Sequence, residues 1–283
     1  GGNWELDFQS LPKSVSPPFA HKSLANYKGV LPVDAQQVGG EAFAKGDFLQ
    51  IGINANGTHG AQTSGTPSGY VNITTDGRDD GNAMLGFIAD TGQDGFSGGD
   101  YDGEFYTPGT PEEGFGVKFN GTSYNNNTSG SLGQISGAVN AVSTTASEAS
   151  IDWSGSVNGL QVDRTSTVSE TGFFIRMTTT LTNTTSSAMT GLYWLHTLDP
   201  DNDQTIHGSY TTRNTITSQG NLAVDQLAMV TAEQNASGGG ATGGTEETGS
   251  SVSLLAFDSR ARVSTGGFAV RDAQTVYQAN GTS

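Results

Sequence analysis

The stretch Gly172–Thr182, GFFIRMTTTLT, decides the fold class of this chain. Apolar side chains and threonines share one face of it at alternate positions: Phe173, Ile175, Met177, Thr179 and Leu181. A repeat of two residues is typical of a β-strand with one buried face, whereas a helix repeats every 3.6 residues. We therefore predict a strand over this stretch.

A second strand is predicted over Gly191–Leu198, where Leu192, Trp194, His196 and Leu198 share one side. The polar segment Asn183–Thr190 between the two strands predicts a hairpin. No H-E-x-x-H motif surrounds His196, so we interpret it as a packed or hydrogen-bonded histidine rather than a metal ligand.

Other alternating segments, such as FGVKF at 115–119 and SVSLLAF at 251–257, are separated by Gly, Pro, Asn and Asp. This pattern predicts an all-β antiparallel β-sandwich with long Gly/Asp-rich loops, either one large sandwich or two stacked halves. We treat 1–283 as a single unit with a candidate internal boundary near 143–150. The Gly-rich run 236–250 predicts a flexible loop.

The composition excludes several classes of protein. The chain has 12 Lys and Arg against 28 Asp and Glu, a net charge of −16 that disfavours a nucleic-acid partner. No apolar run is long enough for a transmembrane helix, so we expect no membrane span. The absence of cysteine excludes disulfides and zinc–thiolate sites.

The acidic residues cluster in two segments. Ten carboxylates lie between Asp76 and Glu113, and Asp199–Asp203 has aspartates at alternate positions. Ca²⁺ takes six to eight oxygen ligands of this kind, although neither segment has the spacing of an EF-hand. The alternatives are solvated surface loops or a structural Ca²⁺ held by some of Asp90, Asp94, Asp100, Asp102, Asp199, Asp201 and Asp203.

An enzymatic alternative depends on paired carboxylates. Glu104, Glu112 and Glu113 include a candidate acid and base for a polysaccharide-active enzyme, if two of them face each other across a cleft. Ser97 lies in a G-x-S-x-G match, but an acidic turn surrounds it rather than a strand and a helix. Trp4, Trp153 and Trp194 either stack on sugar rings or pack in the core.

Eight N-x-S/T sequons make a glycoprotein a further expectation. They begin at Asn56, Asn72, Asn120, Asn126, Asn127, Asn183, Asn235 and Asn280.

Scattered motifs resemble those of a known class of proteins. They are Leu85–Asp90, Gly103–Gly116, Leu181–Asn183, Leu192–Trp194, Asp199–Asp203 and Asp258–Arg262. Together they resemble secreted or cell-surface β-sandwich modules of bacteria, of the kind found in adhesins and anchored surface proteins. The resemblance implies an extracellular, mostly non-enzymatic module and transfers no catalytic residue.

We therefore expect a non-enzymatic extracellular or cell-surface structural protein that is adhesive, coat-forming or filament-forming. Self-assembly would proceed by strand addition, with Trp4–Phe8 and Thr275–Tyr277 as donor strands. A cell-surface partner is the other expectation. The alternative functions are a carbohydrate-binding module or a polysaccharide-active enzyme, each with a polysaccharide as its partner.

Overall fold

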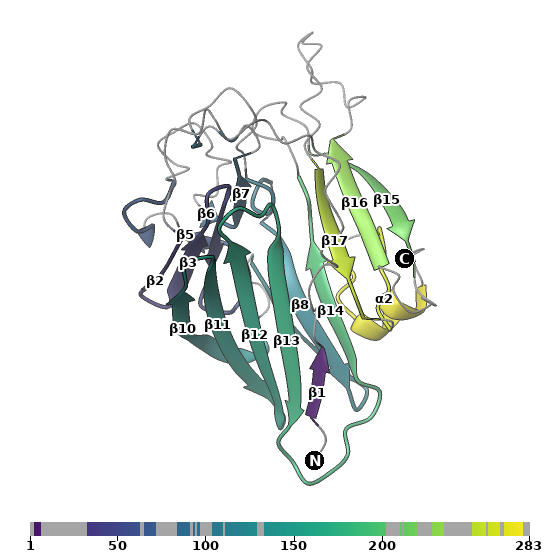
Figure 1. Cartoon of the computed structure of the whole chain (residues 1–283). Helices are drawn as coiled ribbons and strands as arrows, with labels where there is room; N and C mark the ends of the chain where they lie inside the picture. Colours follow the sequence, from purple (N-terminus) through teal and green to yellow (C-terminus); the bar gives the residue numbers. More distant parts are fainter. Residues whose placement is uncertain are drawn as a thin grey trace.

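The computed structural model of the chain is built almost entirely from antiparallel strands (Figure 1). It describes residues 3–6, 33–62, 65–71, 84–90, 93, 95–96, 104–109, 111–128, 133–201, 210, 212–219, 228–234, 251–258, 260–266 and 269–279. The all-β sandwich class is confirmed. None of the helical residues in these ranges forms a segment of the length and apolarity that a bilayer crossing requires.

The largest sheet has five strands in the order β1-β13-β12-β11-β10. Their bounds are β1 (Asn3–Leu6), β10 (Ser136–Thr144), β11 (Glu148–Val157), β12 (Leu160–Ser169) and β13 (Ile175–Asn183). The predicted alternation is present, since Ile151, Trp153, Val162 and Leu181 are all buried on one face. The segment considered as a domain boundary, 143–150, lies in the β10–β11 hairpin within this sheet.

The second layer is formed by two smaller sheets. One has the order β2-β3-β4-β7, with β2 (Asp34–Val38), β3 (Glu41–Lys45), β4 (Leu49–Ile53) and β7 (Phe87–Ala89). The other has the order β14-β8-β9, with β8 (Glu113–Phe119), β9 (Thr122–Asn127) and β14 (Tyr193–Leu198). One core cluster joins both to the five-stranded sheet, and Phe115 meets Trp153 edge-on at 5.3 Å.

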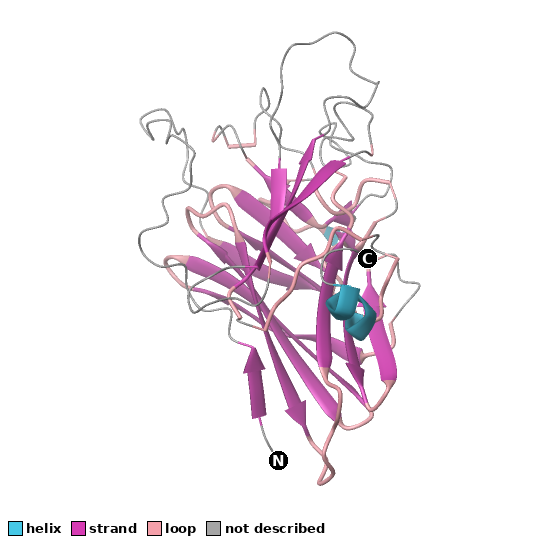
Figure 2. Ribbon diagram, turned by 90° about the vertical axis from the view of Figure 1, so that its right-hand side faces the viewer, coloured by secondary structure: helices cyan, strands magenta, loops and turns pink. Residues whose placement is uncertain are grey.

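Two further sheets complete the molecule. β5 (Ala61–Gln62) pairs with β6 (Met84–Leu85), and β15 (Thr212–Ser218), β16 (Ala228–Gln234) and β17 (Ser251–Ala256) form a three-stranded sheet. The short helix α2 (Ala273–Ala279) packs on β14 and β8 (Figure 2).

The predicted hairpin between residues 172–182 and 191–198 is wrong. β13 pairs with β12 and β1, whereas β14 pairs with β8, so the chain crosses from one layer to the other between them. The strand also begins later than predicted, because Phe173 lies outside it and stacks on Phe48 with ring centroids 4.9 Å apart.

The predicted strand at Thr275–Tyr277 is also wrong, because these residues lie in α2. Asp272 accepts a hydrogen bond from the Thr275 amide at 2.8 Å, which caps the first turn. The same carboxylate pairs with Lys118 Nζ at 2.7 Å, so the cap also fastens the helix to β8. The ring of Tyr277 lies 4.2 Å from the Arg262 guanidinium carbon.

Candidate functional site: a buried polar cluster

The loop 54–60 carries polar groups into the interior of the sandwich. Although this segment is rich in glycine and polar residues, Gly57, Thr58 and His59 are all buried. Trp153 on β11 donates a hydrogen bond from Nε1 to the Ala55 carbonyl at 3.1 Å. Gly57 has φ of +87°, and a Cβ there would meet the Trp153 ring at 2.5 Å. Only glycine fits this approach of loop and sheet.

Glu113, the first residue of β8, is the centre of the cluster and is completely buried. Its Oε2 accepts a hydrogen bond from the His59 amide at 2.7 Å. Its Oε1 lies 2.9 Å from His196 Nε2, 3.4 Å from Arg164 Nη2 and 3.5 Å from His59 Nδ1. The carboxylate therefore joins the loop, β8, β12 and β14 at one point.

Arg164 supplies the positive charge from the opposite sheet. Its Nη1 donates to the Gly57 carbonyl at 2.7 Å. Its guanidinium carbon lies 4.1 Å from the Phe115 ring centroid and 6.0 Å from that of Trp194, which are cation–π distances. A weakly hydrated, planar guanidinium suits such a site better than an ammonium.

Burial and neighbouring charges together determine the pKa values of the ionisable groups in the cluster. Burial alone would raise the pKa of Glu113, but the charges of His59, Arg164 and His196 hold that pKa well below its usual value. Burial lowers the pKa of His59 by more than Glu113 raises it. A guanidinium stays protonated across the physiological pH range, so Arg164 is the main permanent counter-charge of the Glu113 carboxylate.

A second acidic group lies beside the first. Glu112 is fully buried, and its Oε2 accepts hydrogen bonds from Asn127 at 2.9 Å and from Arg271 at 2.8 Å. The Asp199 amide donates to the Glu112 carbonyl at 2.9 Å. Burial, and then the charge of Glu112, raises the pKa of Asp199 to about 6. Burial, and then Asp199, raises the pKa of Asp201 to about 7.

The structure describes three of the seven predicted metal ligands: Asp90, Asp199 and Asp201. Asp90 is buried and accepts hydrogen bonds from the Gly95 and Phe96 amides at 2.7 and 3.3 Å, which closes a turn. Asp199 adjoins Glu112, and the Asp201 amide donates to the Asp199 carbonyl at 3.2 Å. The remaining four lie outside the described residues: Asp94, Asp100, Asp102 and Asp203. Within the described ranges, no three His, Asp or Glu side chains gather in a form that could hold a metal.

The three glutamates of the enzymatic alternative are all inside the protein. Glu104 accepts hydrogen bonds from the Gly86, Phe87 and Tyr106 amides at 2.8–3.0 Å. Glu112 and Glu113 are occupied as described, and all three are 0% exposed. Ser97 lies outside the described residues. The three glutamates therefore serve as internal acceptors in this conformation.

The tryptophans that were predicted either to pack in the core or to bind sugar differ in their exposure to solvent. Trp153 is 1% exposed, and Trp194 is half-buried and stacks on Phe115 at 5.4 Å. The side chain of Trp4 lies outside the described part of the molecule. His196 has the packed environment that we expected, with its side chain 17% exposed against Glu113.

The sequons differ in accessibility. Asn126 and Asn127 are buried, and their side-chain amides donate to Ile135 and Glu112 respectively. Asn120 is exposed in the turn between β8 and β9. Asn72, Asn235 and Asn280 lie outside the described residues.

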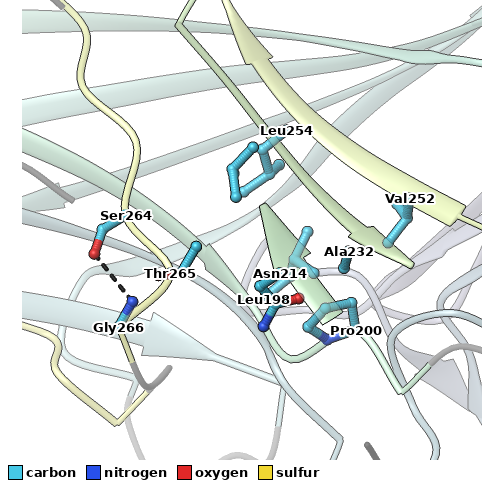
Figure 3. A pocket seen from close by; sticks show the side chains of 10 residues that line it. Leu198, Pro200, Asn214, Ala232, Val252, Leu254, Ser264, Thr265 and Gly266 are labelled. Carbon is cyan, nitrogen blue, oxygen red and sulfur yellow. Dashed lines mark hydrogen bonds between the residues drawn. The ribbon is translucent and has the colours of Figure 1, made fainter. Parts of the chain in front are cut away.

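A small pocket lies at the end of β14, where Leu198 pairs with Glu113 (Figure 3). It has a volume of about 60 Å³ and is lined by the end of β14, the sheet β15-β16-β17 and the segment 264–266. Leu198, Val230, Val252 and Leu254 form most of its apolar wall. Its lining has no charged side chain, and the sequence could not have indicated it because five separate segments contribute.

Comparison with known proteins adds no family. No family model matches the chain, and no curated protein is significantly similar to it.

Proposed function

We propose that this chain is a non-enzymatic structural protein of an extracellular or cell surface, which adheres, coats or forms filaments through strand contacts. The observation that carries the proposal is the use of its buried acids. Glu104, Glu112 and Glu113 are all removed from solvent and bound to backbone amides or cationic side chains. Carboxylates held in this way stabilise a framework, whereas a hydrolase needs two that face a cleft.

The polar cluster also supports a structural role through its connectivity. It ties the loop after β4 to β8 and to β12, so both layers of the sandwich share one set of hydrogen bonds. A hydrogen bond in a low-dielectric interior is stronger than one in water, so a network that spans both layers holds them in one relative position. A rigid module without disulfides suits a surface protein that must keep its shape while other molecules pull on it.

Sheet edges support assembly through strands. β15 is hydrogen-bonded to β16 along one side, and Arg213, Asn214 and Thr215 on it are exposed. β10 is the other edge of the five-stranded sheet, although a bulge between Val139 and Ala141 interrupts its register. Unpaired edges are templates for strand addition, and bulges discourage it.

The experiment is a measurement of molar mass against concentration, by light scattering after size exclusion, with and without Ca²⁺. We expect species larger than the monomer at high concentration. A turnover assay on a polysaccharide panel should show no product above the buffer control. A monomer at every concentration, or hydrolysis that Glu112→Gln abolishes, would overturn the proposal.

A second candidate function, polysaccharide binding, is favoured by one observation. Phe173 and Phe174 are 45% and 46% exposed at the start of β13, and Phe173 lies parallel to Phe48. Exposed aromatic rings stack on sugars. A glycan array should then show binding that Phe174→Ala weakens, and an array without binding would remove this candidate.

A further inference from the structure

Among the described residues, a strand covers the β13 edge of the five-stranded sheet over part of its length. β1 pairs with it antiparallel, from Asn3 opposite Thr182 to Leu6 opposite Thr179. β13 itself continues to Ile175, so its other end, 175–178, extends beyond β1 (Figure 1). The edge therefore accepts a strand, and β13 is longer than the described strand β1 that pairs with it.

β1 is joined to the rest of the protein by a long stretch of chain. Leu6 and Val33 are separated by 26 residues, 7–32. Fully extended, such a stretch spans at most about 90 Å. A compact protein of this length is about 50 Å across. The connection is therefore long enough for β1 to reach β13 of an adjacent copy.

We propose that β1 is exchanged between copies, so that β1 of one chain occupies β13 of a second chain in the same register. This inference rests on the proposed function and names its donor, its acceptor and its partner. An exchanged strand makes the same backbone hydrogen bonds as a strand on its own chain, so local pairing favours neither arrangement. Protein concentration then decides between them, because a long connection lowers the effective concentration of a chain's own β1.

Exchange also makes assembly by strand addition possible even though β1 pairs with β13 of its own chain in the monomer. Each chain has one β1 and one β13 edge, so exchange can close a dimer or continue from copy to copy. The second outcome produces a filament. Thr275–Tyr277 has no part in this scheme, since it lies in α2.

The absence of cysteine makes a direct test available, because introduced thiols are the only ones in the protein. Glu5 lies opposite Thr180 in the register. We would prepare Glu5→Cys and Thr180→Cys as separate full-length chains, mix them at high concentration, oxidise them and run non-reducing gels. A disulfide forms only where Cα atoms lie about 4.4–6.8 Å apart.

The matched control replaces Thr180→Cys with Ser154→Cys. Ser154 lies on β11, two strands further into the same sheet. We expect about 10-fold more mixed disulfide dimer from the Glu5/Thr180 mixture than from the Glu5/Ser154 mixture, because only the first pair is adjacent in the register. Tryptophan fluorescence of each variant verifies that it is folded.

The outcomes separate this inference from the proposed function. If the unmodified protein oligomerises while the two mixtures give equal dimer, exchange of β1 is wrong and assembly must use another edge. The same holds if a chain that carries both Glu5→Cys and Thr180→Cys forms an intrachain disulfide at high concentration and no disulfide-linked dimer. If the unmodified protein is monomeric at every concentration and no mixed dimer forms, both proposals fail.

Discussion

Replacing Arg164 with methionine tests whether the buried cluster holds the two layers together. Methionine retains most of the side-chain volume but removes the charge, the hydrogen bond to the Gly57 carbonyl at 2.7 Å and the contact with Glu113 at 3.4 Å. Glu113 then remains 0% exposed without its main counter-charge. Breaking one partner of a buried pair costs about 3–5 kcal/mol. That loss is a large part of the roughly 5–15 kcal/mol that stabilises a typical domain.

The pH dependence of this loss gives a second signature. In the native protein the pKa of His59 is lowered, chiefly by burial and in part by the charge of Arg164. Without Arg164 the pKa of His59 rises, and a protonated imidazole takes over as counter-ion of Glu113. A raised histidine pKa contributes stability at low pH that is lost as pH rises through the folded-state value. The deficit of Arg164→Met should therefore be larger at about pH 8 than at about pH 5.5.

The assay is urea unfolding followed by the fluorescence of Trp153 and Trp194, both of which adjoin the cluster. The difference between variant and native protein at each pH cancels the titration of groups that both share. The control is Arg176→Met, whose ion pair with Glu148 at 3.1 Å is partly exposed and should contribute less than about 1 kcal/mol. A deficit of Arg164→Met no larger than that of the control, or one that does not vary with pH, would refute the reasoning.

Three further predictions follow from burial and charge. Trp153→Ala should lower the free energy of unfolding in urea by about 3–5 kcal/mol, because this side chain is 1% exposed; a loss under about 1 kcal/mol would contradict it. The pKa values of Asp199 and Asp201 are raised by burial to about 6 and about 7, so the folded state binds protons more tightly, and the melting temperature should rise as pH falls from about 7.5 to about 5. Asp201→Asn should flatten that profile, and an unchanged profile would argue against it. If Asp199 and Asp201 help to hold Ca²⁺, the ion should raise the melting temperature of the native protein but not that of Asp201→Asn. Identical melting curves with Ca²⁺ and with EGTA would rule out a stabilising calcium site.

The fold class followed from alternation, but the pairing of strands did not. Alternation in 172–182 and 191–198 correctly placed Leu181, Trp194 and Leu198 toward the core cluster. Phe173, on the same predicted face, is instead 45% exposed. Alternation carries no information on the partner, and β14 pairs with β8, which lies more than 70 residues earlier in the chain. At Thr275–Tyr277 the β-forming side chains of Val276 and Tyr277 were misleading, because the cap at Asp272 and its pair with Lys118 favour a helix.

The sequence contains a signal for the buried cluster, namely charged residues at inward positions of two strands. Counted in steps of two residues, Glu113 falls on the same strand face as the buried side chains of Phe115, Val117 and Phe119. Arg164 likewise falls on the face of Leu160 and Val162. A charged residue at an inward position is expensive to bury unless an opposite charge meets it. Two strands with such residues of opposite sign therefore indicate facing layers. The contribution of His59 could not be inferred in this way, because side chains in a glycine-rich loop do not alternate between two faces.

A chain of net charge −16 without cysteine has to keep its two layers in register by non-covalent contacts. Apolar packing between sheets is non-directional, so it tolerates small shifts of one layer over the other. A hydrogen-bonded charge pair does not, because the carboxylate at Glu113 needs the guanidinium of Arg164 and the amide of His59 at fixed positions. The buried pair thus stabilises one alignment of the sheets rather than the compact state in general. If so, Arg164→Met should loosen the packing around Trp153 even where the protein remains folded, and hydrogen exchange at β8 and β12 should increase before it does at β10.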